Sequence, residues 1–284
     1  MHELQGAPPQ RDPDESPPDP LREKLHSWLN DQGYPLELRT ARAFQGRGRV
    51  QQSDYYYDTD AQCYREIDVR VTLQADSENL LSWLEVALCI EAKSAPDKPW
   101  VLFSGEEQPL HPIAAALQRI SSPAARDWLG AAALRRSVQN LPLLRVEDHP
   151  GHNLIRASLG PNQREDVAYK ATLSAVKAAH WTAKEASENP DERVSLVAFP
   201  VVVIDAPLFK CSLDSSSGEL KLWRVDCGTL VWRNSVTPAN QGHTIVHVVT
   251  EPAIQGFADN ASQTLEGLGA AYRKHEGRKK GKRK

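Results

Sequence analysis

The feature that most constrains the fold is a pair of alternating segments between residues 63 and 94 of the 284-residue sequence. In CYREIDVRVTL (63–73), apolar residues at 67, 69, 71 and 73 alternate with polar ones. A period of two predicts a β-strand with one buried face. LLSWLEVALCIEAKS (80–94) alternates in the same way after a polar turn. The two segments are therefore predicted to be antiparallel neighbours.

The segments around this pair predict an α/β fold. A helix is expected from residue 20, with Leu21, Leu25, Trp28 and Leu29 on one stripe, and a second helix in PLELRTARAFQGRG (35–48). RVQQSDYYYDTD (49–60) and PWVLFSG (99–105) complete a predicted four-stranded meander. A long helix in 164–187 then precedes SLVAFPVVVIDAPLF (195–209), whose apolar residues fill both faces of a buried strand. This order predicts one α/β domain with a mixed sheet, a meander plus a buried strand, flanked by helices.

Composition limits the class of protein and its compartment. Apolar residues make up 40% of the chain and charged residues 25%, which is ordinary for a globular protein. The apolar runs are too short to span a bilayer, and the first 20 residues contain no secretory signal. The four cysteines have no paired spacing, so we expect reduced thiols in a cytoplasmic protein, without a zinc site.

The two ends differ in composition from the part between them. Residues 1–20 are rich in proline and predict a disordered leader. Residues 273–284 contain eight Lys or Arg and one Glu, and predict a disordered basic tail that can bind a polyanion. Between them, 21–272 is expected to be one domain, with an insertion at about 106–164. The net charge of −3 leaves this body strongly acidic once the tail is set aside.

Charged residues within the two alternating segments predict a site. Glu91 and Lys93 project from the same face of their strand because side chains alternate. If the two strands are neighbours, Asp68 can lie close to Glu91. Two adjacent carboxylates repel unless a cation lies between them, and oxygen ligands favour Mg²⁺ or Mn²⁺ over zinc or copper. A lysine beside such a site can orient or deprotonate a water, or neutralise charge on a phosphate, which is the chemistry of phosphodiester hydrolysis.

These residues resemble the signature of the PD-(D/E)xK nuclease superfamily, which has the restriction-endonuclease-like fold. The signature is an acid on one strand, then an acid, any residue and a lysine on the next. Glu66-Ile67-Asp68 supplies the first part, with isoleucine in place of proline, and Glu91-Ala92-Lys93 supplies the second. Members also carry a glutamate on the helix before the meander, where this chain has Glu37. The resemblance covers 21–105 and 165–210.

The resemblance implies a role for each matching residue. Asp68 and Glu91, with the main-chain carbonyl of Ala92, would hold Mg²⁺ or Mn²⁺. Lys93 would position or activate the attacking water and stabilise the transition state. Glu37 would be an outer or second-metal ligand, or would orient Lys93. The implied function is a metal-dependent nuclease acting on DNA, in bacterial defence or repair.

Other interpretations of the same residues remain open. Glu91 and Lys93 can instead form an exposed cross-strand ion pair, with Asp68 paired to Arg65 or Arg70. The fold can serve as a catalytically silent module for binding nucleic acid or protein, or the enzyme can act on RNA. A homodimer or a partner protein is compatible with the sequence. The tyrosine run 55–57 fits either a strand with one aromatic face in the core or a surface that stacks on bases.

Overall fold

The structure of the chain is a computed structural model that describes residues 19–75, 82–105, 110–158, 166–188, 193–233 and 243–281. The predicted disordered leader lies outside the described residues up to position 18, and so do the last three residues of the predicted tail. None of the described helices is both long enough and apolar enough to cross a bilayer.

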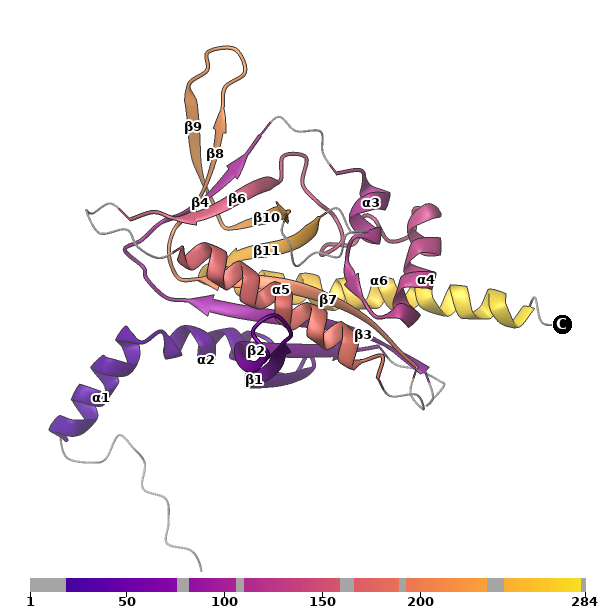
Figure 1. Ribbon diagram of the computed structural model, residues 1–284, viewed down its shortest axis with the longest axis horizontal. Helices are drawn as coiled ribbons and strands as arrows, with labels where there is room; N and C mark the ends of the chain where they lie inside the picture. Colours follow the sequence, from indigo (N-terminus) through magenta and orange to yellow (C-terminus); the bar gives the residue numbers. More distant parts are fainter. Residues whose placement is uncertain are drawn as a thin grey trace, which may run out of the picture.

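One large mixed sheet forms the centre of the described structure (Figure 1). Its main path is β1-β2-β3-β7-β11-β10-β6-β4-β8-β9, and the short β5 pairs with β7 as the eleventh strand. The strands are β1 (Arg49–Asp58), β2 (Cys63–Gln74), β3 (Ser82–Lys93), β4 (Trp100–Ser104), β5 (Ile120–Ser121), β6 (Gly151–Arg156), β7 (Arg193–Ile204), β8 (Leu208–Leu213), β9 (Leu220–Val225), β10 (Cys227–Trp232) and β11 (Thr244–Thr250). The predicted class, α/β with a mixed sheet flanked by helices, is therefore confirmed.

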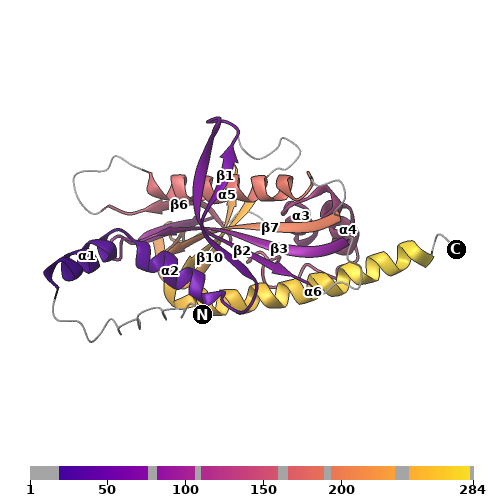
Figure 2. The ribbon, with the colours of Figure 1, turned by 90° about the horizontal axis from the view of Figure 1, so that it is seen from below.

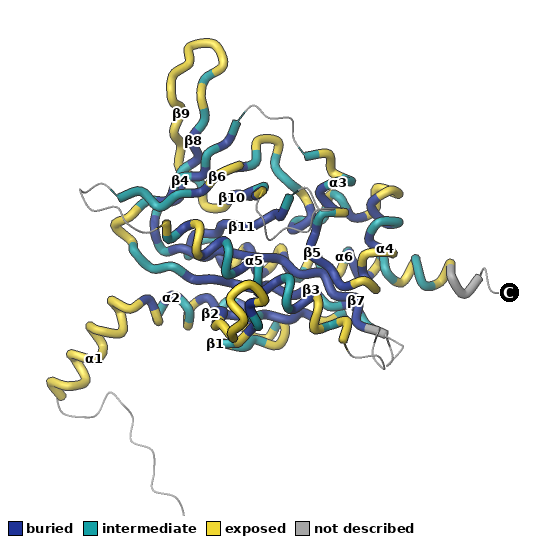
Figure 3. Tube along the Cα trace, viewed as in Figure 1, coloured by how far each residue is buried: buried dark blue, intermediate teal, exposed yellow. Residues whose placement is uncertain are grey.

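Helices cover both faces of the sheet. Figure 2 shows α5 (Val167–Glu185) on one side and α6 (Ile254–Gly281) on the other. On the α6 side, one core joins the sheet to α2 (Tyr34–Ala43), α4 (Pro123–Leu134) and α6. α3 (Pro112–Leu117) packs against α4. The central strands β3 and β7 are buried on both faces (Figure 3). The nearly continuous apolar sequence of β7 matches this burial, whereas the alternation in β3 predicts only one buried face.

The predicted four-stranded meander is wrong in its last member. β1, β2 and β3 are consecutive antiparallel neighbours, as the alternation predicts. β4 instead pairs with β6 and β8, elsewhere in the sheet. The place beside β3 is taken by β7, which runs parallel to it over all twelve residues. A strand that is apolar on both faces gains most from this central position, because it removes the largest apolar area from water there.

Helix α1 (Pro20–Asp31) forms where the sequence predicts it, with Asp19 accepting a hydrogen bond from the Leu21 backbone N–H. It extends away from the sheet, and Figure 3 shows it as exposed. Its apolar stripe is exposed by between 41% and 62%, so this stripe contributes nothing to the core.

The carboxy-terminal end departs from the prediction of a disordered basic tail from residue 273. Helix α6 continues to Gly281 and carries most of the basic residues as helix. Lys and Arg are good helix formers, and extending an existing helix avoids the cost of nucleation. The region 106–164, predicted to be an insertion, contains α3, α4, β5 and β6, and β5 and β6 are members of the sheet.

Candidate active site

The site lies where two strands separate. The β2–β3 ladder runs from the pair Gln74 and Glu85 to the pair Val69 and Ile90, and then ends. β3 continues beside β7 to Lys93. The N–H of Ala92, which has lost its β2 neighbour, donates instead to Asp68 Oδ2 at 2.7 Å. This side-chain contact satisfies a backbone donor that would otherwise be left unpaired. It also fixes the Asp68 carboxylate at the point where β2 and β3 separate, which we call the fork.

Lys93 connects the two predicted acids. Its Nζ lies 2.6 Å from Glu91 Oε1 and 3.7 Å from Asp68 Oδ2. The distance between Glu91 Oε1 and Asp68 Oδ2 therefore cannot exceed the sum of these two distances. Nζ also donates to the carbonyl oxygen of Ala92 at 3.1 Å. The exposed fractions of the three side chains are 11% for Glu91, 17% for Asp68 and 30% for Lys93, so the cluster is largely withdrawn from water.

The exposed-ion-pair interpretation does not describe this arrangement. Arg65 pairs with Asp58 at 2.8 Å. Arg70 pairs with Glu185 at 3.0 Å and also with Asp54. Both arginines thus have other partners, and the partner of Asp68 is Lys93.

Glu37 enters from the first turn of α2. That helix begins against the end of β3: Gly33, at a φ of 85°, comes so close to Ser94 that a Cβ on the glycine would lie 3.2 Å from the serine Cβ. Burial first, and the negative charge of Asp68 second, raise the pKa of Glu37 to about 7, although the positive charge of Lys93 opposes the rise. Glu37 acts on the cluster through its charge, since it makes no direct hydrogen bond to it.

The cluster contains more negative than positive charge. Burial raises the pKa of both Asp68 and Glu91, and the negative charge of Asp68 raises the pKa of Glu91 further. Burial alone would lower the pKa of Lys93, but its acidic neighbours raise it, so it stays an ammonium. The charged side chains that interact electrostatically in this cluster are Glu37, Glu66, Asp68, Glu91 and Lys93. Among the described side chains that act most strongly on Glu37, together with Glu37 itself, there are thus four acids and one cation.

This balance, and a donor set made only of oxygen, fit a hard divalent cation. Among the described residues no group of three or more His, Cys, Asp or Glu side chains is already arranged to hold a metal. The ammonium of Lys93 lies against the Glu91 carboxylate and the Ala92 carbonyl instead. The chemistry of the residues fits a metal ion, and one carboxylate oxygen is now engaged by the lysine.

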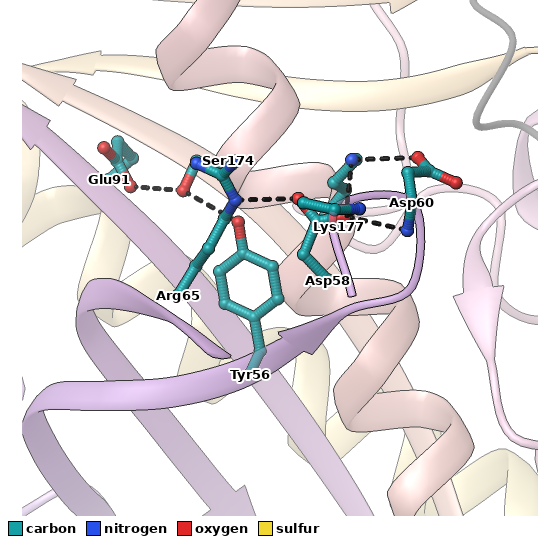
Figure 4. Close-up of polar contacts among 8 residues, drawn as sticks. Tyr56, Asp58, Asp60, Arg65, Glu91, Ser174 and Lys177 are labelled. Carbon is teal, nitrogen blue, oxygen red and sulfur yellow. Dashed lines mark hydrogen bonds and ion pairs between the residues drawn. The ribbon is translucent and has the colours of Figure 1, made fainter. Parts of the chain in front are cut away.

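Helix α5 contributes a second partner to Glu91 that the sequence analysis missed. Ser174 Oγ donates to Glu91 Oε2 at 2.8 Å, and Tyr56 Oη donates to Ser174 Oγ at 3.4 Å (Figure 4). Both oxygens of Glu91 are therefore hydrogen-bonded, one by β3 itself and one by α5. The sequence gives little signal for this contact, because Ser174 is half-buried and lies at the edge of the small apolar residues that form the buried face of α5.

A buried acid fastens the turn between β1 and β2 to the same helix. The Asp58 side chain is only 3% exposed and pairs with Lys177 at 2.7 Å and with Arg65 at 2.8 Å (Figure 4). The N–H groups of Asp60 and Ala61 also donate to it. Burial would raise the pKa of Asp58, but the hydrogen bonds from Lys177 and these N–H groups lower it overall.

An open cavity of about 870 Å³ lies between the β1–β2 turn and α5, with Glu91 in its wall. Its other lining residues include Arg65, Tyr169, Lys170 and Lys177. Tyr56 is 2% exposed, so its ring belongs to the core, whereas Tyr55 is 59% exposed. The cavity therefore gives access from solvent to one of the two acids at the fork.

Comparison of the chain with protein-family models, with curated proteins and with solved structures found no match. The fold and the site thus define an α/β protein with a buried acid–lysine cluster beside an open cavity.

Proposed function

We propose that the chain is a metal-dependent nuclease that hydrolyses phosphodiester bonds in DNA, built on the restriction-endonuclease-like core of the PD-(D/E)xK superfamily. The observation that carries the proposal is the meeting of Asp68, Glu91 and Lys93 at the fork between β2 and β3. An acid, a second acid and a lysine on adjacent strands are what the resemblance requires. Glu37 approaches from the preceding helix, as the same resemblance implies.

Asp68, Glu91 and the Ala92 carbonyl would hold Mg²⁺ or Mn²⁺, with Glu37 as an outer ligand. When bound, such an ion supplies Lewis-acid stabilisation of charge on the phosphate. The excess of acids over cations favours this binding electrostatically. Binding also requires the Lys93 ammonium to release the Glu91 oxygen that it contacts, which leaves the ammonium free to face the substrate.

The protonation states of Lys93 and Glu37 indicate a different role for each residue. Lys93 has a raised pKa, so it is an ammonium at neutral pH and acts by donating hydrogen bonds to water or to phosphate oxygens. Glu37 has a pKa of about 7 without a bound cation, and a cation held nearby would lower this pKa. We therefore assign charge stabilisation to Lys93 and keep Glu37 as an outer ligand.

The basic end of α6 extends substrate contact beyond the site. Figures 1 and 2 show that α6 ends at the far end of the molecule from α2. Eight Lys or Arg between 273 and 284 would bind the nucleic-acid backbone by releasing counterions. The acidic body then limits close contact with the nucleic acid to the cavity and this end.

The test is incubation of supercoiled plasmid with Mg²⁺, with Mn²⁺ or with EDTA. We expect nicking by the wild type with either ion and none with EDTA, Lys93→Ala or Glu91→Ala. Lys184→Ala is the matched control, because Lys184 is 58% exposed on α5 and lies outside the cluster. Equal nicking by the wild type and Lys93→Ala would remove the catalytic assignment. DNA binding without cleavage would identify a silent module, and competition with RNA would establish the preferred substrate.

A further inference from the structure

Glu91 is held from two directions by groups of different origin. Lys93 comes from the same strand, whereas Ser174 lies 83 residues further along the chain on α5. Only the contact with Lys93 follows from strand periodicity. The contact with Ser174 exists because α5 packs across β3 and brings a hydroxyl over the carboxylate.

We propose that Ser174, with Tyr56 behind it, is a positioning residue that fixes the Glu91 carboxylate for binding a divalent cation. The inference rests on the proposed function, because it assigns Glu91 to the metal. Ser174 has one hydroxyl proton, and it gives this proton to Glu91 Oε2 at 2.8 Å. Its lone pair accepts the proton of Tyr56, so the serine hydroxyl cannot turn away without losing that bond as well.

The groups behind this pair are well anchored. Tyr56 is 2% exposed, and its strand is tied to α5 by Asp58, which pairs with Lys177 three residues after Ser174. The spacing between α5 and the β1–β2 turn is therefore set by a buried ion pair adjacent to the serine. A fixed outer partner restricts a ligating carboxylate to one orientation, and loss of such a partner typically reduces metal affinity about 10- to 100-fold.

The same helix offers a matched control. Thr182 lies two turns after Ser174, and its hydroxyl contacts Cys89 Sγ at 3.5 Å, two residues before Glu91 on β3. Thr182→Val keeps the branched shape and removes a hydroxyl from the same helix–strand contact without touching a carboxylate. Ser174→Thr keeps the hydroxyl, and the half-buried position beside the cavity leaves room for the added methyl group.

The experiment has one arm without metal and one with Mn²⁺. In the metal-free protein, the carboxyl ¹³C resonance of Glu91 is identified by its loss in Glu91→Gln. We expect Ser174→Ala to shift this resonance, Ser174→Thr to restore most of the shift and Thr182→Val to leave it unchanged. In the second arm, Mn²⁺ affinity measured by electron paramagnetic resonance should fall about 10-fold or more in Ser174→Ala, less in Tyr56→Phe, and not in Thr182→Val.

The outcomes separate the two proposals. An unmoved Glu91 resonance in Ser174→Ala overturns the positioning role whatever the Mn²⁺ result. A moved resonance with unchanged Mn²⁺ affinity overturns that role too, but leaves the nuclease proposal intact. A wild type that binds no Mn²⁺ and cuts no DNA overturns the proposed function, and the role of Ser174 in it.

Discussion

Replacing Lys93 by methionine tests whether the fork needs a positive charge. Methionine preserves most of the length of the side chain and removes the ammonium that lies 2.6 Å from Glu91 and 3.7 Å from Asp68. Removing one partner of a buried ion pair costs about 3–5 kcal/mol, because the remaining charge is left uncompensated. Lys93 is 30% exposed, so we expect a loss near the lower end, about 3 kcal/mol in the free energy of unfolding.

The loss should depend on pH with a defined sign. Burial already raises the pKa of Asp68 and Glu91, and Lys93 opposes this rise. Without Lys93 both values move higher still. An acid whose pKa is higher in the folded state than in the unfolded state makes the fold less stable as pH rises from its unfolded-state pKa to that higher value. The variant should therefore be closest to the wild type at about pH 5 and farthest from it at about pH 8.

The assay is urea unfolding followed by tryptophan fluorescence at both pH values, with and without millimolar Mg²⁺. We expect Mg²⁺ to restore part of the lost stability in Lys93→Met at the higher pH, because a cation replaces the ammonium. Lys184→Met is the control, since its exposed ion pair with Glu188 is worth about 0.3–0.5 kcal/mol. A loss as small as that of the control, equal at both pH values, would refute the view that Lys93 balances buried acids.

Three further substitutions, one of them with a control variant, follow from the geometry. Because the pKa of Glu37 is raised from 4.5 to about 7, the wild type loses stability as pH rises through this window, and Glu37→Gln should flatten the dependence of melting temperature on pH. Asp58→Asn leaves two cations facing a neutral amide and should cost about 3 kcal/mol by urea unfolding; no loss would contradict the anchoring role. Gly48→Ala would place a Cβ 2.5 Å from the Thr72 carbonyl oxygen and should cost about 1–3 kcal/mol, whereas Gly256→Ala, with nothing within 4 Å, should not destabilise the protein.

The residues at the fork could be predicted from the sequence, but the position of β4 and the contact made by Ser174 could not. Asp68, Glu91 and Lys93 belong to two strands joined by one turn, so local alternation suffices to place them on adjacent strands. The position of β4 depends on which distant strand pairs with it, and local patterns do not encode that choice. Ser174 could not be assigned because its contact with Glu91 depends on the packing of α5 against β3.

The error at the carboxy terminus has a different origin. A run of like charges usually indicates a solvated, disordered segment. Here the run continues a helix whose earlier residues, including Phe257, Ala261 and Leu268, are buried in the core. The packed part supplies the nucleus, and the charged residues extend it.

The direction of α6 has a consequence for the length of substrate that the protein can sense. The helix starts next to α2, where Glu251 just before it pairs with Arg39, and its 28 residues form a rod about 42 Å long. Its basic run begins at Arg273, about 29 Å from the start of the helix, which equals about 8 base pairs of duplex at roughly 3.4 Å per step. Under the proposed function, α6 therefore sets a minimum substrate length. Oligonucleotides much shorter than this length can bind at the fork or at the basic end, but they cannot contact both at once.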